Sequence, residues 1–194
     1  PLTSSVSPRR ATEVLIVLTI LVISMGGMIR IYDAGESCPD WPTCFGTWGF
    51  GISEEEQGEW WEENPDEADS RGSGHRYSSF QIFTEWFHRL LAGAFVGPLV
   101  VLNWLLVRKE TWTSPRVKGV SSLALGLILW QGAIGWLTVK MDNENWSVAI
   151  HLGSAMAFLI SLIWLWMEIR RDEDELPDWI SFDPLIGKKW RKLV

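Results

Sequence analysis

The chain has 194 residues, of which 47% are apolar and 21% are charged, and its formal net charge is −7. The charges lie in blocks that separate four apolar segments, at about residues 11–31, 80–107, 119–139 and 146–167. Each segment has about 20 residues or more, enough to cross ~30 Å of hydrocarbon at ~1.5 Å per residue. We therefore exclude a soluble domain, see no sign of nucleic-acid binding, and predict an all-α membrane protein: a four-transmembrane-helix bundle with one long outer loop.

The first apolar segment is predicted to remain as a signal anchor, because no small-residue cleavage site follows it. By the positive-inside rule both termini and the middle loop are cytoplasmic, and residues 32–79 form an extracytoplasmic loop of a multi-pass cell-membrane protein. We expect one transmembrane domain, residues 1–171, and a cytoplasmic tail, residues 172–194. The basic residues that set this orientation are Arg9, Arg10, Arg108, Lys109, Arg116, Lys118, Arg170, Arg171, Lys188, Lys189, Arg191 and Lys192.

The outer loop has two parts. Residues 54–69 are a dense run of Glu and Asp, which we interpret as a solvated face or a flexible excursion. Before this run lie the only two cysteines, Cys38 and Cys44. In an oxidising compartment they are expected to form a disulfide that closes a small loop, since prolines between them favour a tight bend. A redox-active dithiol is the alternative, and zinc is disfavoured because only His75 lies nearby.

Two of the three histidines lie within apolar segments, where an ionisable residue indicates a functional site. His88 lies ~14 Å into the second segment and His151 ~8 Å into the fourth, counted from their outer ends at helical rise. The imidazoles therefore reach similar depths, and such a pair can clamp a heme iron axially. The alternative is that each is a buried packing residue. His75, in a Gly/Ser-rich stretch, is interpreted as a solvated loop residue.

Further polar residues accompany His88. In the heme hypothesis Arg89 and Arg30, at the outer end of the first segment, pair with the heme propionates. Snorkelling to lipid headgroups is the alternative for Arg30. Glu85 projects from the same helical face as His88, and it either pairs with Arg89 or faces the ligand as a proton acceptor. Gln131, in the third segment, is expected to contact the cofactor or to make an interhelical hydrogen bond.

The chain resembles the heme A synthases in five stretches, which follow one another in the order of that family. The Glu-x-x-His-Arg helix combined with the Cys-Pro-Asp-Trp-Pro loop is the specific part of this resemblance, and neither motif alone is specific. The five stretches are Gly26-Gly27-Met28-Ile29-Arg30, the loop at residues 35–46, Glu85-Trp86-Phe87-His88-Arg89, residues 131–139, and His151-Leu152 with Ala155.

The resemblance implies a membrane enzyme that oxidises a methyl group of heme O to the formyl group of heme A. It assigns the axial ligation of the heme iron to His88 and His151, ties Glu85 to activity, and matches Cys38 and Cys44 to the outer cysteine pair of the family. The expected cofactor is heme b, heme O or heme A, whose iron supplies the redox chemistry. Membrane lipid and heme O synthase are the expected partners.

The sequence departs from the family in length, because the usual member has two similar four-helix halves and this chain carries one. It resembles compact, half-length archaeal versions, and we predict a homo-oligomer, most simply a dimer. The alternative function is a non-catalytic b-type cytochrome with the same two histidine ligands. A four-helix thiol oxidoreductase is a weaker hypothesis, because such proteins need a close active cysteine pair and usually a second pair.

Overall fold

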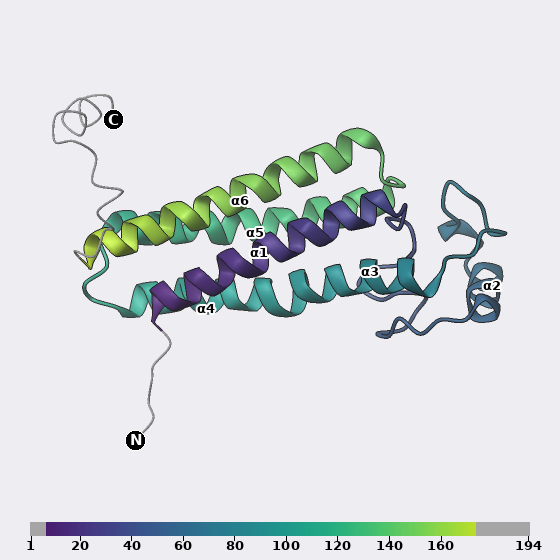
Figure 1. The fold of residues 1–194 in the computed structure, drawn as a ribbon, viewed down its shortest axis with the longest axis horizontal. Coiled ribbons are helices and arrows are strands. Elements are labelled where there is room, and N and C mark those ends of the chain that lie inside the picture. Colours follow the sequence, from purple (N-terminus) through teal and green to yellow (C-terminus); the bar gives the residue numbers. More distant parts are fainter. Residues whose placement is uncertain (1–6, 174–194) are drawn as a thin grey trace, which may run out of the picture.

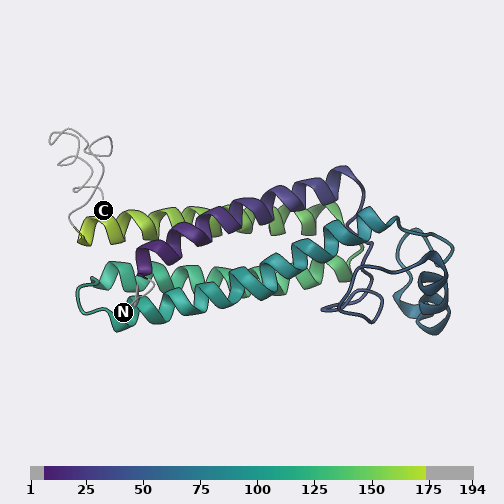
Figure 2. The same ribbon diagram turned by 60° about the horizontal axis from the view of Figure 1, so that its bottom comes forward.

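The computed structural model describes residues 7–173, within which the chain forms helices and loops but no β-strand. Four helical rods lie side by side, and the long loop projects beyond one end of the bundle, opposite the end where the described chain begins and stops (Figures 1 and 2). All four rods are long and apolar enough to cross a membrane, which confirms the predicted fold class. The rods are α1 (Pro8–Ile31), α3 (Ser79–Leu90) continued by η2 (Leu91–Val96) and α4 (Gly97–Lys109), α5 (Pro115–Lys140) and α6 (Asn145–Asp172).

The predicted cytoplasmic tail, residues 172–194, lies outside the described residues from position 174 onward. Within the described part, side-chain caps mark where three of the four rods begin, α1, α3 and α5. The side chains of Ser7 and Ser114 accept backbone N–H groups of the first turn, and a proline follows each. Ser78 and Gln81 form a capping box at the start of α3. The rods therefore extend beyond the apolar segments by polar turns, and α5 begins at Pro115 instead of about residue 119.

The second rod is not a continuous α-helix, because η2 is a π-helix. Pro98 has no N–H to give to the carbonyl four residues earlier, and its ring would crowd that carbonyl. The N–H of Gly97 bonds instead to the carbonyl of Ala92, five residues back. Such π-turns are rare and often lie at functional sites. This one directly follows the stretch that contains Glu85 and His88.

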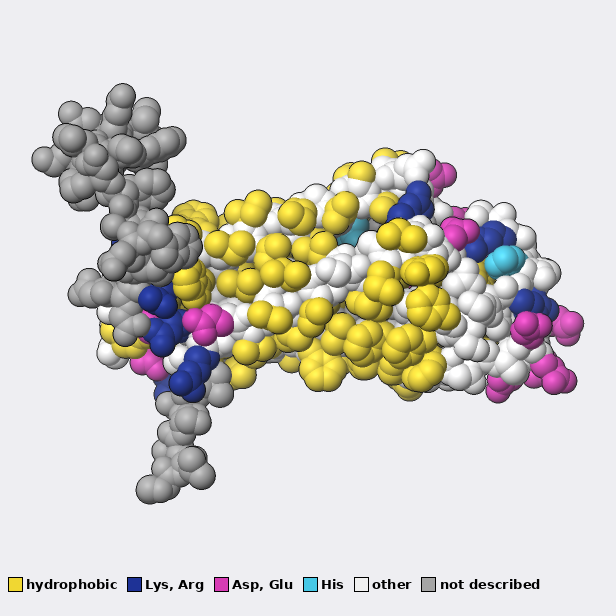
Figure 3. Space-filling view, in the orientation of Figure 1, with side chains coloured by type: hydrophobic (Ala, Val, Ile, Leu, Met, Phe, Trp, Pro, Cys, Tyr) yellow, Lys and Arg dark blue, Asp and Glu magenta, His cyan; other side chains and the backbone are white. Residues whose placement is uncertain are grey.

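The bundle has two buried apolar clusters and a large outward apolar surface. Leu129 is 67% exposed and Ile160 is 62% exposed, and apolar side chains cover the visible face along the rods (Figure 3). A surface of this extent suits hydrocarbon rather than water. The clusters contain Leu15, Val96, Val100, Ala124, Phe158 and Leu162 in one, and Val107, Val117, Val120, Leu165 and Ile169 in the other.

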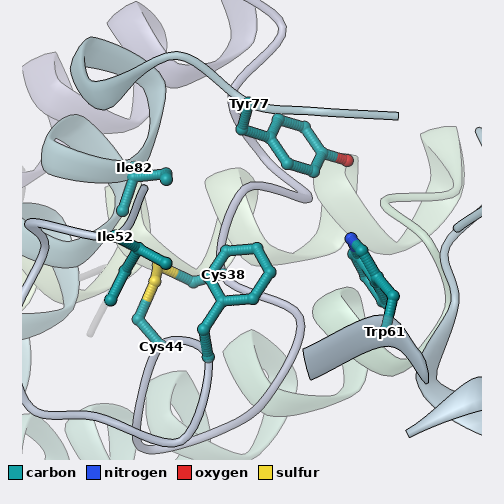
Figure 4. Close-up of a cluster of buried hydrophobic side chains, with 7 residues drawn as sticks. Cys38, Cys44, Ile52, Trp61, Tyr77 and Ile82 are labelled. Carbon is teal, nitrogen blue, oxygen red and sulfur yellow. A yellow bond between two sulfur atoms is a disulfide. The ribbon is translucent and has the colours of Figure 1, made fainter. Parts of the chain in front are cut away.

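Residues 32–78, here called the outer domain, form a packed unit beyond the end of the bundle. Helix α2 (Glu54–Glu63) begins with a capping box of Ser53 and Glu56, and η1 (Pro65–Glu67) follows it. The acidic run therefore forms a solvated face, as predicted. Most of it belongs to helix α2, whose opposite side is buried through Gln57 and Trp61. Trp61, only 2% exposed, belongs to a third cluster with Cys38, Cys44, Phe45, Ile52, Tyr77 and Ile82 (Figure 4).

Gln57 joins α2 to the segment that enters α3. Its side-chain amide donates to the carbonyl of Tyr77 at 3.0 Å and accepts from the Tyr77 N–H at 2.8 Å. Both residues are buried, and the Tyr77 hydroxyl donates to Asp69. Because buried amides are costly when unpaired, this reciprocal pair fixes the position of α2 against the bundle.

Glu36 is a buried carboxylate of the outer domain, 9% exposed. The guanidinium of Arg71 lies 3.2 Å from it and also pairs with Asp33 at 3.3 Å. Ser70 donates a hydrogen bond to the same carboxylate. Burial raises the pKa of Glu36 above its ordinary value, and the charge of Arg71 offsets this only in part.

We expect Glu36→Gln to change how stability depends on pH. Because the pKa of Glu36 is higher in the folded chain than in the unfolded one, its stabilising contribution is present below the unfolded value and is lost as the pH rises through the folded value. The thermal midpoint of the wild type should therefore fall relative to that of Glu36→Gln as the pH rises above the ordinary pKa of a glutamate carboxyl group. Exposed Glu55, changed to Gln, is the control, and identical profiles for all three proteins would contradict the expectation.

Candidate functional site

Glu85 lies in the middle of α3 and is only 4% exposed. Its Oε2 accepts hydrogen bonds from the hydroxyl of Ser37 at 3.0 Å and from the N–H of Cys38 at 2.9 Å. Its Oε1 lies 2.5 Å from the guanidinium of Arg89, one helical turn further on. Of the two alternatives that the sequence left open for Glu85, the structure has the ion pair with Arg89, and it adds two contacts with the outer domain.

Arg89 binds the main chain of the cysteine loop. It donates to the carbonyl of Cys38 at 2.6 Å, to that of Thr43 at 3.0 Å, and to that of Asp40. Glu85 and Arg89 together thus satisfy N–H and C=O groups of one loop with charged partners, which makes strong hydrogen bonds. The guanidinium that we predicted to face a propionate is directed at the cysteine loop in this structure.

Cys38 and Cys44 form the predicted disulfide, with an S–S distance of 2.03 Å. The two residues are 0% and 1% exposed, and they pack against Ile52 and Phe45 in the outer-domain cluster (Figure 4). Thiol–disulfide exchange requires that an attacking thiolate reach a sulfur atom. The burial therefore favours a structural link over the alternative of a redox-active dithiol.

His88 is held against α1. Its Nδ1 lies 3.1 Å from the main-chain carbonyl of Val22, which favours a proton on Nδ1 and leaves the lone pair on Nε2. A Cβ added at Gly26, one turn further along α1, would lie 3.5 Å from Cε1 of the ring. The Val22 carbonyl thus fixes the tautomer of His88, and the close approach of Gly26 fixes the position of its ring. In metal sites, the hydrogen-bond partner of the non-ligating nitrogen orients an imidazole in the same way.

His151 is packed against α5. A Cβ added at Gly135 would lie 3.1 Å from Cε1 and 3.7 Å from Nε2 of the ring. The Nδ1 of His151 is buried and has no hydrogen-bond partner among the described residues. Because buried polar atoms are normally paired, an unpaired one needs an explanation such as a bound group.

Gln131 connects α5 to α6 next to this ring. Its amide donates to the main-chain carbonyl of His151 at 3.3 Å and to the hydroxyl of Ser154 at 2.5 Å. This is the interhelical hydrogen bond that we gave as one alternative for Gln131. It holds together the two helices that carry His151 and Gly135.

Both imidazoles lie in the half of the bundle next to the outer domain. His88 is ~14 Å from the start of α3 and His151 ~9 Å from the start of α6 at helical rise. At the same end, Arg30 donates to the side-chain oxygen of Asn145 at 2.8 Å. His75 lies apart, with its ring 4.7 Å from that of Tyr77 in the outer domain.

Three further groups of the site, Ser37, the Val22 carbonyl and Asn145, were not predicted from the sequence. Ser37 lies within the motif that resembles the family, so its position was a usable signal. A main-chain carbonyl such as that of Val22 carries no residue-type signal, because every residue has one. Asn145 precedes the fourth apolar segment and reads as an ordinary loop residue.

Three known proteins illustrate what the chain is similar to. The heme A synthase of Shewanella oneidensis is 32% identical over 158 residues, which are 81% of this chain and 44% of that protein. The heme A synthase of Maricaulis maris is 30% identical over 189 residues, 88% of this chain and 53% of that protein. The heme A synthase-mitochondrial ferredoxin fusion protein of Schizosaccharomyces pombe is 29% identical over 168 residues, 76% of this chain and 26% of that protein.

The chain thus spans about half, or less, of the length of these curated relatives. No solved structure matches it significantly. The family model described as cytochrome oxidase assembly protein, COX15-CtaA, matches residues 9–186. That match covers nearly the whole of the four membrane-length rods together with the outer domain. The chain therefore belongs to the COX15-CtaA family of cytochrome oxidase assembly proteins.

Proposed function

We propose that the chain is a heme A synthase-like membrane oxidoreductase, which binds heme O and oxidises one methyl group of the porphyrin to the formyl group of heme A. The family and the names of the relatives support this activity. The observation that carries the proposal is the pair of imidazoles, His88 and His151, on two rods near the same end of the bundle, each seated against a glycine of a neighbouring helix.

The residues present fit a heme better than a bare metal ion. Among residues 7–173, no group of three or more His, Cys, Asp or Glu side chains could hold an ion. A heme takes only one or two ligands for its iron from the protein, and His88 on α3 and His151 on α6 would be those ligands. Nε2 of His88 is available because Nδ1 faces Val22, and Nδ1 of His151 lacks a partner. A bound heme supplies the redox chemistry, and the protein orients it.

Conversion of a methyl to a formyl group takes up one oxygen atom and, counted against water, releases four protons and four electrons, and an external oxidant would have to accept these electrons. The protein must therefore move protons. We assign this role to Glu85, whose carboxylate joins Ser37 and Cys38 at the boundary between the bundle and the outer domain. We assign Arg30 to a heme carboxylate, and we assign Arg89 to holding the cysteine loop rather than the ligand.

We further propose that the bundle lies in the cell membrane with the outer domain outside. Basic residues occupy the last turns of α4 and α6, Arg108 and Lys109 in one and Arg170 and Arg171 in the other. These turns lie at the end of the bundle away from the outer domain (Figure 1), and the positive-inside rule assigns that end to the cytoplasm. A homo-oligomer and a contact with heme O synthase remain predictions from the resemblance.

The activity is tested by expressing the chain in a host that makes heme O and extracting the pigments of the purified protein. We expect heme A from the wild type, and at least ~100-fold less from Glu85→Gln with bound heme retained, since loss of a proton-transfer group costs about that factor. Bound heme b without conversion would instead identify a b-type cytochrome and refute the proposed activity.

Gly135→Ala is expected to weaken heme binding through His151. The added Cβ would press on the ring at 3.1 Å, so the imidazole must tilt or α5 and α6 must separate. Overpacking of this kind costs ~1–3 kcal/mol, which corresponds to an affinity roughly 5- to 150-fold lower. Heme titration and the optical spectrum measure the effect. Gly132→Ala is the matched control, because nothing lies within 4 Å of its Cβ, and an equal effect of both changes would contradict the role of Gly135.

A further inference from the structure

The loop before α2 folds back along the outward face of α3 (Figures 1 and 2). The ring of Phe50 lies 5.0 Å from that of Phe83 and 4.8 Å from that of Trp86. The indole N–H of Trp86 donates to the main-chain carbonyl of Trp48 at 2.7 Å. Residues 47–51 are therefore docked on a membrane-spanning rod and not on the acidic face of the outer domain.

The aromatic side chains of this loop remain exposed. Trp48 is 74% exposed, Trp41 is 51% exposed and Phe50 is 40% exposed. In water, an exposed apolar patch around Trp48 and Phe50 would be unfavourable. Tryptophan is instead enriched where hydrocarbon meets headgroups, because its ring is apolar and its N–H is polar. Through Phe83 and Trp86 this patch adjoins α3.

Charge is divided within the outer domain. Residues 41–53 contain no charged side chain, whereas α2, which follows directly, contains Glu54, Glu55, Glu56, Glu59, Glu62 and Glu63. Helix α2 lies at the end of the outer domain that is remote from the bundle (Figures 1 and 2), and acidic side chains gather at that end (Figure 3). One side of the outer domain thus suits lipid and the other suits water.

We propose that residues 47–51 are an interfacial anchor, which inserts Trp48 and Phe50 into the headgroup layer of the adjoining lipid leaflet. The partner is the phospholipid bilayer itself. The backbone N–H and C=O of Thr47 bond to Cys44 at 3.1 and 2.9 Å, so the anchor is joined directly to the disulfide. The anchor holds the cysteine loop at the membrane surface, whatever reaction the bundle performs.

Spin labelling of the full chain in phospholipid nanodiscs tests this proposal. The native cysteines form a buried disulfide, so a single introduced cysteine takes the label. Gly49→Cys places the label between Trp48 and Phe50 and keeps both rings, and an added Cβ there makes only an ordinary contact at 3.7 Å. Glu59→Cys on α2 is the aqueous reference, and Leu129→Cys on α5 is the lipid reference. Power saturation measures collisions of each label with oxygen and with a water-soluble nickel chelate.

We expect the ratio of oxygen to nickel collisions at position 49 to lie between the two references and at least about threefold above that at position 59. Adding Trp48→Ser and Phe50→Ser to Gly49→Cys should bring the ratio down to the aqueous reference. A position-49 ratio equal to that at position 59 would overturn the proposal. Low collision rates with both reagents would also overturn it, since protein would then cover the loop. Retention of the gel-filtration volume shows that each variant is folded.

Discussion

Replacement of Glu85 by alanine is expected to detach the cysteine loop from α3 and to lower the free energy of unfolding by about 3–5 kcal/mol, the usual cost of breaking a buried ion pair. The change leaves Arg89 without its carboxylate and the N–H of Cys38 without its acceptor. Glu85→Gln keeps an oxygen for that N–H but removes the charge, so we expect a smaller loss of stability from it.

Two measurements check this prediction. Thermal unfolding in detergent gives the change in stability, and the rate of disulfide reduction by a small thiol reports whether the loop has opened. We expect Glu85→Ala to reduce faster than the wild type, because the buried sulfurs of Cys38 and Cys44 become reachable. Glu55→Gln on the solvated face of α2 is the control. If Glu85→Ala kept the wild-type midpoint and reduction rate, the carboxylate would not be what holds the loop.

The two histidines are expected to respond differently to removal. His88→Ala should lower heme occupancy to less than about a tenth of the wild-type value. The reason is that Val22 orients the His88 ring and makes it the stronger ligand of the iron, and a hydrogen-bond partner of this kind contributes about 10–100-fold to metal affinity. His151→Ala should keep more heme, bound through His88, because no hydrogen bond among the described residues orients the His151 ring, whereas Val22 orients that of His88. This difference between the two histidines follows from their hydrogen bonds to the protein: His88 has one with Val22, and the Nδ1 of His151 has none among the described residues.

Optical spectra and heme content of the purified variants measure this difference. We expect the spectrum of His151→Ala to show five-coordinate heme and to revert toward that of the wild type when imidazole is added. His75→Ala should leave the spectrum unchanged, because His75 lies beside Tyr77 in the outer domain. Equal heme loss from His88→Ala and His151→Ala would contradict the expected difference, and heme loss from His75→Ala would contradict the assignment of the ligands.

Hydropathy and helical spacing were sufficient to predict the four rods and to put Glu85, His88 and Arg89 within about one turn of the same rod. The disulfide followed from the cysteine count and the turn-forming prolines. These features are local, so a single stretch of sequence carries the signal. The partners of Arg89 are main-chain carbonyls about 50 positions earlier, and no local pattern indicates them.

Helix α2 was missed although its sequence contained two usable signals. Ser53 and Glu56 have the spacing of a capping box, and Gln57 and Trp61 lie four residues apart on one helical face. The density of acidic residues outweighed these signals in our interpretation. The close fit of Gly26 to His88 and of Gly135 to His151 was not predictable in detail, because glycine is also common wherever membrane helices simply pack.

The π-helix at Leu91–Val96 sets the phase between the two halves of the second rod. Each residue of an α-helix turns the chain by ~100°, so one extra residue in a turn rotates everything beyond it by that angle. Asn103 on α4 donates to Thr12 on α1 at 3.0 Å, and this hydrogen bond holds α4, the half of the rod beyond the π-helix, in place. If α4 stays fixed, deletion of one residue from the π-helix would rotate α3 about its axis by ~100°. His88 would then point away from Val22 and Gly26.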